Sequence, residues 1–339
     1  MVILVTGGLG FIGSNFVRYY QAHYPEDELI VLDAMTYAAN SKNLEGINVK
    51  IVEGDITNEE HVHEVVRSGL DVIINFAACS HVDRSLHDAN EFVRTNVYGT
   101  QVLLDAAKNA GVKRFLQIST DEVFGDLGAG AKPALEEDVL RPTSLYAASK
   151  AASDLIALSY YKTHGVDVIV TRATNNYGPY QYPEKLIPCM ILRALQGKKL
   201  PLYGDGLQIR EWLHVEDHCV MLNHVMRHGH AGEIYNIGGG RELTNYTVVR
   251  RIIDYVGRGE IEHVEDRPGH DRRYAVNSEK MAKLGLLQQR VFVEGLKKTI
   301  DWYREHESWW KPILEGSHHQ AWMEKNYEKR GVAKLFEGK

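Results

Sequence analysis

The sequence predicts an α/β protein built on a doubly wound parallel sheet, with a smaller mixed α/β domain toward the C-terminus. Short apolar runs rich in β-branched residues alternate with helical patterns over the first half of the chain, which indicates a parallel sheet covered on both faces. A glycine-rich turn follows the first run, and the alternation breaks after Asn175. We therefore expect two domains, one formed by residues 1–174 and 209–239 and the other by residues 175–208 and 240–330.

The first strand is expected over residues 1–5, and it leads through a glycine-rich turn into a helix over residues 14–23. Gly7, Gly10 and Gly13 have the spacing of the dinucleotide-binding fingerprint of the Rossmann fold. In that fingerprint the glycines allow a tight turn, close approach of the backbone to a pyrophosphate, and close packing of the helix on the strand. Because the motif follows a strand and opens a helix, it predicts a dinucleotide site.

A second strand over residues 28–33 ends in Asp33, 20 positions after Gly13. A carboxylate at that place accepts a hydrogen bond from the adenosine ribose and repels a 2′-phosphate, so the predicted cofactor is NAD rather than NADP. The alternative is that Asp33 only caps the loop that follows it.

Further strands are expected over residues 49–52, 71–78, 112–119, 166–172 and 233–237, with helices over 91–110 and from about Tyr146 to 162. Asp55, after the third strand, is placed to meet the adenine edge. Residues 125–142 are rich in Gly, Pro and acidic residues and are expected to form a loop over the site.

Tyr146 and Lys150 lie four residues apart, which places both side chains on one face of a helix. A lysine ammonium beside a phenol favours the phenolate, so the pair predicts a base near neutral pH that takes a proton from an alcohol. That alcohol can also lose a hydride when an oxidised nicotinamide lies beside it. Taken alone, the pair is more simply a surface Tyr and Lys, but the predicted nicotinamide site favours the catalytic interpretation.

Composition argues against several other classes of protein. The net charge of −6 does not fit a general nucleic-acid binder, and no apolar run reaches membrane-spanning length. The three cysteines lie far apart, without metal-binding spacing, and indicate neither a disulfide framework nor a metal site. These features are typical of a cytoplasmic enzyme.

Several longer motifs carry a family resemblance. They are residues 80–85 (SHVDRS), 119–123 (STDEV), 175–188 (NNYGPYQYPEKLIP), 208–212 (QIREW) and 266–274 (DRPGHDRRY). With the glycine fingerprint and Tyr146-Ala-Ala-Ser-Lys150, the chain resembles the extended short-chain dehydrogenase/reductase superfamily and, in its nucleotide-sugar branch, the dTDP-glucose 4,6-dehydratases. The resemblance runs from Val2 to Trp310 and more loosely to Tyr327. It implies an NAD-dependent lyase that converts dTDP-glucose to dTDP-4-keto-6-deoxyglucose, in the biosynthesis of rhamnose and other deoxysugars.

The resemblance also implies catalytic roles. Tyr146 takes the C4 hydroxyl proton, Lys150 lowers its pKa and holds the nicotinamide ribose, and Thr120 bonds the C4 oxygen. Asp121 is the acid for the departing C6 hydroxyl, and Glu122 is the base for the C5 proton. A related epimerase or decarboxylase shares everything except this acidic pair, and a 4,6-dehydratase of another nucleoside diphosphate glucose remains a further alternative.

Binding roles follow from the same resemblance. The cofactor contacts are expected at Gly7, Gly10, Phe11, Ile12, Gly13, Asp33, Ala34, Thr36, Asp55, Ile56, Phe76, Ala77, Ala78, Ser80, Thr95, Tyr146, Lys150 and Asn176. The contacts to the nucleotide sugar are expected at Ser80, Thr120, Asn175, Lys185, Leu186, Pro201, Tyr203, Arg210, Asn245, Arg267 and His270. The chain departs from the family pattern at Cys79, where Glu is usual, and at Leu145, where Pro is usual.

A homodimer is expected, paired through the helices that begin near residues 91 and 149, as in related enzymes. These helices carry small and apolar residues on more faces than one domain needs. The residues are Ala106, Ala107, Ala151, Ala152, Leu155 and Ile156. The alternative is that some of them, such as Ala152 and Leu155, pack inside the subunit.

Overall fold

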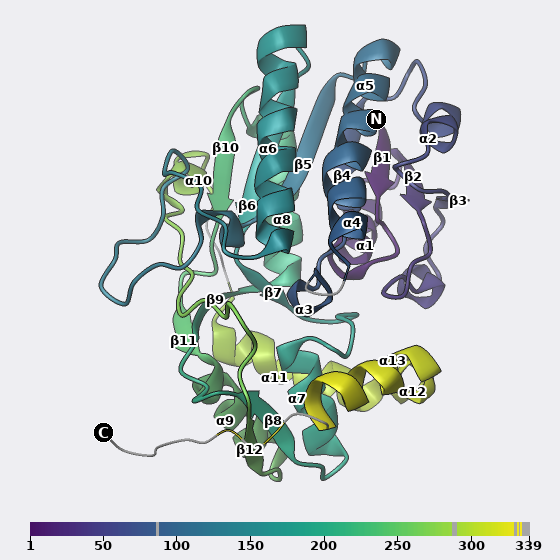
Figure 1. Cartoon of the computed structure of the whole chain (residues 1–339). Coiled ribbons are helices and arrows are strands. Elements are labelled where there is room, and N and C mark those ends of the chain that lie inside the picture. The colour runs from purple at the N-terminus through teal and green to yellow at the C-terminus, as the bar shows by residue number, and fades with distance from the viewer. Residues whose placement is uncertain (86–87, 287–289, 329–330, 332, 334–339) are drawn as a thin grey trace.

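The computed structural model describes residues 1–85, 88–286, 290–328, 331 and 333 (Figure 1). Its largest element is a seven-stranded parallel sheet with the strand order β10-β6-β5-β4-β1-β2-β3. The strands are β1 (Val2–Thr6), β2 (Glu28–Asp33), β3 (Lys50–Glu53), β4 (Val72–Asn75), β5 (Arg114–Thr120), β6 (Val168–Ala173) and β10 (Ile234–Ile237). The order reverses between β1 and β4, and ligands of such sheets bind in the crevice at the carboxyl ends of the strands. The predicted doubly wound sheet is confirmed.

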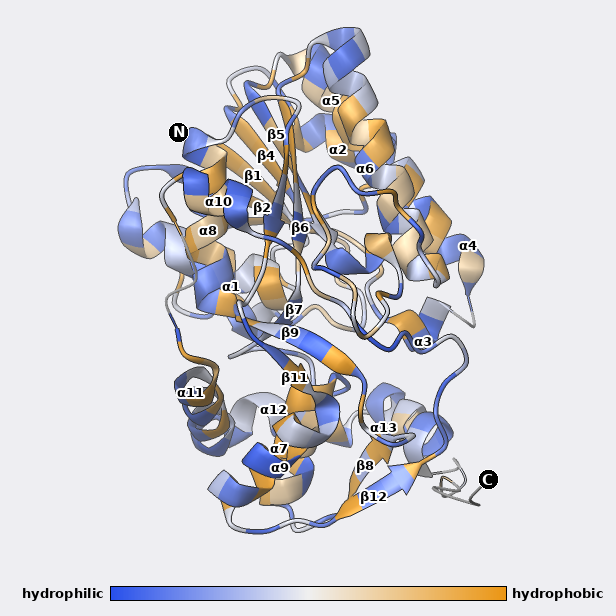
Figure 2. Cartoon of the chain, turned by 90° about the vertical axis from the view of Figure 1, so that its left-hand side faces the viewer, coloured by the Kyte–Doolittle hydropathy of each residue, from blue (hydrophilic) through white to orange (hydrophobic). Residues whose placement is uncertain are grey.

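Helices cover both faces of this sheet, and apolar strands lie between them (Figure 2). One buried cluster joins the sheet to α1 (Phe11–His23) and α8 (Val215–His228). A second joins the other face to α2 (Glu59–Val65), α5 (Thr100–Ala110) and α6 (Leu145–His164). Burial of the strands on both faces explains why they are continuous apolar runs in the sequence.

The helix predicted over residues 91–110 consists of three consecutive pieces. These are α4 (Ala89–Phe92), the π-helical segment η2 (Val93–Gly99) and α5. The π-helical segment carries Asn96, whose Nδ2 donates to Ser149 Oγ at 2.8 Å and whose Oδ1 accepts from the Cys79 amide at 2.8 Å. A widened turn of this kind is often found near functional sites.

A smaller unit lies at the carboxyl end of the main sheet and has its own buried cluster. Its three-stranded sheet is formed by β7 (Asn175–Tyr177), β9 (Ile209–His214) and β11 (Glu242–Thr244), and a parallel pair by β8 (Leu200–Tyr203) and β12 (Ile261–Val264). Its helices are α7 (Leu186–Leu195), α9 (Asn245–Val256), α11 (Phe292–Glu305), α12 (Glu307–Glu315), α13 (Ser317–Met323) and the short η4 (Glu324–Glu328). The remaining short helices are α3 (Val82–Ser85), α10 (Glu279–Lys283), η1 (Ser41–Leu44) and η3 (Asp121–Phe124).

One part of the expected domain division is corrected by strand pairing. The sequence predicts that residues 209–239 belong to the first domain, but β9 pairs with β7 and β11 and not with the main sheet. After β9 the chain returns to the first unit, where α8 packs on the main sheet and β10 pairs with β6. The division otherwise stays a prediction, and residues 287–289 and 329–330 of its second part lie outside the described residues.

Over the described residues, no helix is both long and apolar enough to cross a membrane. The same residues contain no group of three His, Cys, Asp or Glu side chains placed to hold a metal ion.

Candidate active site

A cavity of about 470 Å³ opens at the carboxyl ends of the strands, where the sheet order reverses. The turn after β1 forms its floor. Gly7 has a φ of +66°, and a Cβ there would lie 2.7 Å from the Ala77 amide nitrogen, so only glycine fits. A Cβ on Gly13 would overlap the Gly7 carbonyl oxygen, which explains the close packing of α1 on this turn. Gly10 precedes α1 without a side-chain cap, so the first amides of the helix stay available for an anion.

The cavity collects the predicted cofactor residues almost completely. Those that line it are Gly7, Gly10, Phe11, Ile12, Gly13, Asp33, Ala34, Thr36, Asp55, Ile56, Phe76, Ala77, Ala78, Ser80, Thr95, Tyr146 and Lys150. Asn176 is the exception, because its Nδ2 donates to the Thr174 carbonyl oxygen and its Oδ1 contacts His218 Nδ1. The departure at Cys79 also lines the cavity, where burial raises the pKa of its thiol to about 12.

Asp33 lies at the end of β2 and is almost fully buried. One carboxylate oxygen accepts from the Leu9 amide and the other from the Met35 amide, each at 2.9 Å. Burial raises the pKa of Asp33, although both amide bonds favour the charged form. Asp33 therefore caps the loop that follows β2, and it also lines the cavity, so the two interpretations given from the sequence do not exclude each other.

Tyr146 and Lys150 both lie on α6 and line the same cavity. Burial lowers the pKa of Lys150 to about 8, the nearby Asp154 carboxylate opposes that shift, and Lys150 Nζ donates to the Ile118 carbonyl oxygen at 2.6 Å. The pKa of Tyr146 is raised, first by burial and then by the Glu122 charge. The expectation of a phenol already shifted toward neutral pH is thus wrong for the protein alone, because burial and the Glu122 charge raise the pKa of Tyr146.

Thr120, Asp121 and Glu122 follow one another where β5 ends and η3 begins. Thr120 Oγ1 caps this turn by accepting from the Glu122 amide at 3.3 Å, and it donates to Asp121 Oδ1 at 3.2 Å. Asp121 is 3% exposed, and one oxygen of each carboxyl is buried without a partner in the protein. These groups are therefore not a solvated turn.

The two carboxyls have different electrostatic surroundings. Burial raises the pKa of Asp121 well above its ordinary value, and the charges of Glu122 and Glu211 add to that shift. Burial also raises the pKa of Glu122, but Arg267, Arg210 and Lys185 oppose the shift. Carboxyls separated in this way can serve as acid and base respectively. These surroundings favour Asp121 as the acid and Glu122 as the base, and the assignment stays a prediction.

Positive charge gathers on the side of Glu122 that faces the smaller unit. Lys185 precedes α7 and donates to the Ser80 carbonyl oxygen at 3.1 Å. Arg210 is buried over the Tyr274 ring, and Arg267 pairs with Asp83 at 2.6 Å while its buried Nε has no partner in the protein. Cations of this kind suit a diphosphate.

The other predicted substrate residues lie on the smaller unit. Asn175 and Asn245 each have a buried Oδ1 without a partner in the protein. Leu186 begins α7, and Pro201 and Tyr203 belong to β8. His270 contacts Asp266 at 2.6 Å and meets the Tyr203 ring edge-on.

Three positioning residues were missed by the sequence analysis. Asp83 accepts from both Arg267 and Tyr203, the latter at 3.1 Å. Glu184, 2% exposed, accepts from Tyr37 and Arg84, and Asn96 clamps the chain at Cys79. The available signal was the presence of Asp83 and Glu184 inside the family motifs, next to residues that were singled out.

A model of the NAD dependent epimerase/dehydratase family matches residues 3–238. The chain belongs to that family. It is 49% identical to a dTDP-glucose 4,6-dehydratase from Streptomyces niveus, over 92% of this chain and 96% of the relative. It is 51% identical to a low-salt glycan biosynthesis protein from Haloferax volcanii, over 89% of this chain and 98% of the relative. A crystal structure of a dTDP-glucose 4,6-dehydratase from Streptomyces venezuelae with NAD bound has a TM-score of 0.89 at 48% identity, and the match covers 92% of this chain and 100% of that one.

The family assignment confirms the predicted resemblance and NAD as the cofactor. The cavity fits a dinucleotide on structural grounds as well. Its floor admits only glycine at Gly7, the free amides at the start of α1 suit a pyrophosphate, and Asp33 closes the ribose end.

Proposed function

We propose that the protein removes water from dTDP-glucose to give dTDP-4-keto-6-deoxyglucose, while NAD stays bound and is not consumed. The observation that carries this proposal is the pair Asp121 and Glu122, whose surroundings separate their pKa values. The pair directly follows Ile118, Ser119 and Thr120 at the end of β5, and the first two of these line the dinucleotide cavity. The relatives named dTDP-glucose 4,6-dehydratase support the choice of substrate.

Bound NAD would supply a hydride acceptor for C4 of the hexose and return the hydride to C6. Tyr146 accepts the proton of the C4 hydroxyl, and Thr120 donates a hydrogen bond to the C4 oxygen. Tyr146 acts in this step as a phenolate, which the charge of Lys150 stabilises, since Lys150 has a pKa of about 8 and stays largely protonated at neutral pH. The proton that Tyr146 gains replaces the one that Asp121 later gives to the departing water, so both groups end the cycle as they began it.

Elimination uses the two carboxyls in sequence. The C4 ketone acidifies the C5 proton, which Glu122 removes, while Asp121 protonates the C6 hydroxyl so that it leaves as water. Once the C5–C6 double bond has formed and C6 has been reduced, Glu122 returns its proton to C5. The sugar is then neither oxidised nor reduced overall, which is why the cofactor is not consumed.

The substrate's diphosphate is assigned to Lys185, Arg210 and Arg267, and its base to the Pro201–Tyr203 side of the smaller unit. This assignment rests on the charge gathered there and on the buried partnerless atoms of Asn175 and Asn245, which a polar ligand would satisfy.

The test is to incubate the protein with dTDP-glucose and to follow the alkali-dependent absorbance of a 4-keto-6-deoxy sugar. Epimerisation or decarboxylation without loss of water would support the second candidate activity of this family, which needs no buried acid. UDP-glucose in a parallel reaction tests the nucleobase preference. Turnover that consumes NAD stoichiometrically would contradict the proposal.

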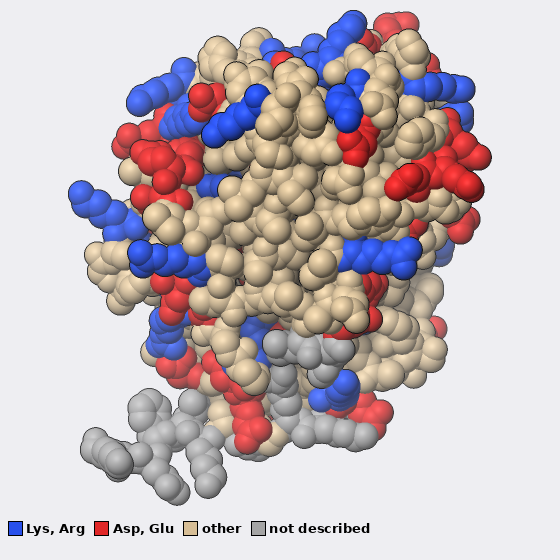
Figure 3. Space-filling model, turned by 45° about the horizontal axis from the view of Figure 1, so that its top comes forward, with Lys and Arg blue, Asp and Glu red and all other residues tan. Residues whose placement is uncertain are grey.

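A homodimer paired through α5 and α6 is part of the proposal. Ala106, Ala107 and Ala151 are buried within the subunit, but Leu155 is 60% exposed and Val93 and Tyr98 are also exposed. The face over these helices carries few charged side chains (Figure 3). Light scattering at micromolar concentration checks the dimer, and a monomer would contradict it.

We also propose a cytoplasmic role in rhamnose or other deoxysugar biosynthesis. The resemblance and the three unpaired thiols at Cys79, Cys189 and Cys219 support it, since disulfides are rare in reducing compartments. Cell fractionation and loss of the deoxysugar on gene deletion test these two parts.

A further inference from the structure

The end of the chain forms a strap across the smaller unit, which we define as α13 and η4, residues 317–328. It follows α12 and lies beside α7 (Figure 1). Farther along, Gly331 accepts from the Glu265 amide at 2.9 Å, and the Ala333 amide donates to His263 at 3.0 Å. The strap is thus anchored beyond its end to the chain at and just after β12.

One side of the strap contacts the cofactor-binding unit. Trp322 meets the His81 ring edge-on at 5.0 Å and lies under the Arg84 guanidinium at 4.2 Å. His318 stacks on Tyr37 at 5.1 Å, and Tyr37 lines the dinucleotide cavity. The strap therefore connects the loop that carries α3 to the smaller unit.

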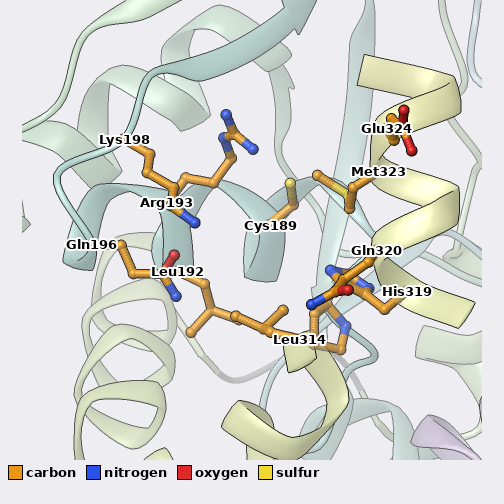
Figure 4. A pocket seen from close by; sticks show the side chains of 11 residues that line it. Cys189, Leu192, Arg193, Gln196, Lys198, Leu314, His319, Gln320, Met323 and Glu324 are labelled. Carbon is orange, nitrogen blue, oxygen red and sulfur yellow. The ribbon is translucent and has the colours of Figure 1, made fainter. Parts of the chain in front are cut away.

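The middle of the strap is packed into the protein. Trp322, Met323 and Cys189 of α7 form a buried apolar cluster with Tyr327. Figure 4 shows Met323 of the strap beside Cys189, at one side of a cavity of about 340 Å³ between the strap and α7. Asn326, also buried, donates to the Trp322 carbonyl oxygen at 3.0 Å. A segment packed in this way is a fixed wall rather than a loose tail.

The far end of the strap reaches the nucleotide side of the proposed site. The Tyr327 ring stacks on the Tyr203 ring with centroids 5.3 Å apart and planes 20° apart. The Tyr203 hydroxyl donates a hydrogen bond to Asp83, and the same carboxylate accepts a hydrogen bond from Arg267. The contacts that hold the Tyr203 ring include its hydrogen bond to Asp83, the edge-on contact with His270 and the stacking contact from the strap.

We propose that the strap is the outer wall of the nucleotide site, and that Tyr327 is a positioning residue that holds Tyr203 for stacking with the nucleobase. This inference rests on the proposed function, because it takes Tyr203 as the base-contacting side chain. Tyr327 covers one face of the Tyr203 ring, so the base uses the other. Removal of Tyr327 frees that ring to turn and weakens nucleotide binding without touching the reacting sugar.

The test compares Tyr327→Ala, Tyr327→Phe and the matched control Tyr255→Ala, whose tyrosine lies half-exposed on α9 away from the strap. Tyr327→Ala should raise the Kd for dTDP and the KM for dTDP-glucose roughly five- to ten-fold, as expected for a lost aromatic pair. Its kcat and NAD content should stay within about two-fold, because ground-state and transition-state binding weaken equally. Tyr327→Phe keeps the stacked ring and loses only the hydroxyl contact with Tyr203, so its Kd should lie between those of the wild type and Tyr327→Ala. The control should match the wild type.

Two results would overturn the inference. An unchanged Kd in Tyr327→Ala would make the strap merely structural, and a lower Kd would mean that Tyr327 sits where the base belongs. A wild type that binds dTDP but does not dehydrate dTDP-glucose would contradict the proposed function alone, and the Kd comparison would still decide the inference.

A second measurement does not depend on a variant. Lys325 is exposed on the strap and offers a site for trypsin. Binding of dTDP should slow cleavage there, because the nucleotide completes the wall. Faster cleavage with dTDP would show that the nucleotide displaces the strap, and an unchanged rate would show that the two are not coupled; either result contradicts the inference.

Discussion

Replacing Asp121 by Asn and Glu122 by Gln together should separate the two halves of the proposed reaction. Both substitutions keep the shape of the side chains and leave the Glu122 amide able to donate to Thr120. They remove the two groups to which the proposal assigns donation of a proton at C6 and removal of one from C5. Tyr146, Lys150 and the dinucleotide cavity are unchanged, so oxidation at C4 should still occur.

The size of the effect follows from the burial of the pair. Asp121 is 3% exposed and burial dominates the pKa of both groups, so solvent is a poor substitute for either. Loss of a positioned acid or base costs about 10²–10⁴ in rate. That corresponds to about 3–5 kcal/mol on the elimination barrier. We expect a loss in this range for the double variant.

The assay mixes the variant with dTDP-glucose and follows reduced-nicotinamide absorbance together with the 4-keto-6-deoxy product. The double variant should accumulate the absorbance and form little product. Tyr146→Phe serves as the contrasting variant, because it should leave the cofactor oxidised. Dehydration by the double variant at close to the wild-type rate would refute the acid and base roles.

Three further predictions concern the cavity, the pH profile and the core. Gly7→Ala should lower the NAD content of the purified protein, because the new Cβ meets the Ala77 backbone. The control Gly46→Ala, also at positive φ but in open space, should keep its NAD, and equal NAD contents in the two variants would contradict this. Glu122 must be ionised to act as a base, so activity falls as the pH drops through its raised pKa. Lys185→Met removes a cation that lowers this pKa and should therefore move the acidic limb of the pH–activity profile to higher pH. A shift of the acidic limb to lower pH would contradict the assignment. Arg172→Leu should cost about 3–5 kcal/mol in urea unfolding because it strands the fully buried Asp154, and Asp154→Leu in the same chain should recover much of the loss.

The strands and the dinucleotide turn were predictable from the sequence because their causes are local. Parallel strands buried on both faces must be apolar throughout, and Gly7 is required by its own φ and by one close approach. Position in the sheet then follows from alternation with helices. The same reasoning predicts that Thr120, Asp121 and Glu122 lie beside the ligand, since ligands of such sheets bind where strands end.

The unpredicted features depend on contacts between distant segments. β9 has the length of a main-sheet strand, and only its pairing with β7 and β11 places it in the smaller unit. Asp83 meets Arg267 across 184 positions, and Asn96 reaches Ser149 from a π-helical turn that no local pattern marks. The pKa of Tyr146 was misjudged for the same reason, because helical spacing reveals the lysine but not the burial or Glu122.

Burial also explains how the site can be ready before substrate arrives. Asp121 and Glu122 each keep a buried oxygen without a partner, and Arg267 keeps a buried Nε in the same state. A buried unsatisfied polar atom costs about 1–3 kcal/mol, so these atoms destabilise the fold and persist only because the surrounding structure holds them. A bound nucleotide sugar offers hydrogen-bond partners to all three atoms. Binding would then remove the cost that these unsatisfied atoms impose on the free protein, and this gain adds to the binding free energy. The polar atoms left unsatisfied in the core of this site are therefore the ones that the substrate is expected to complete.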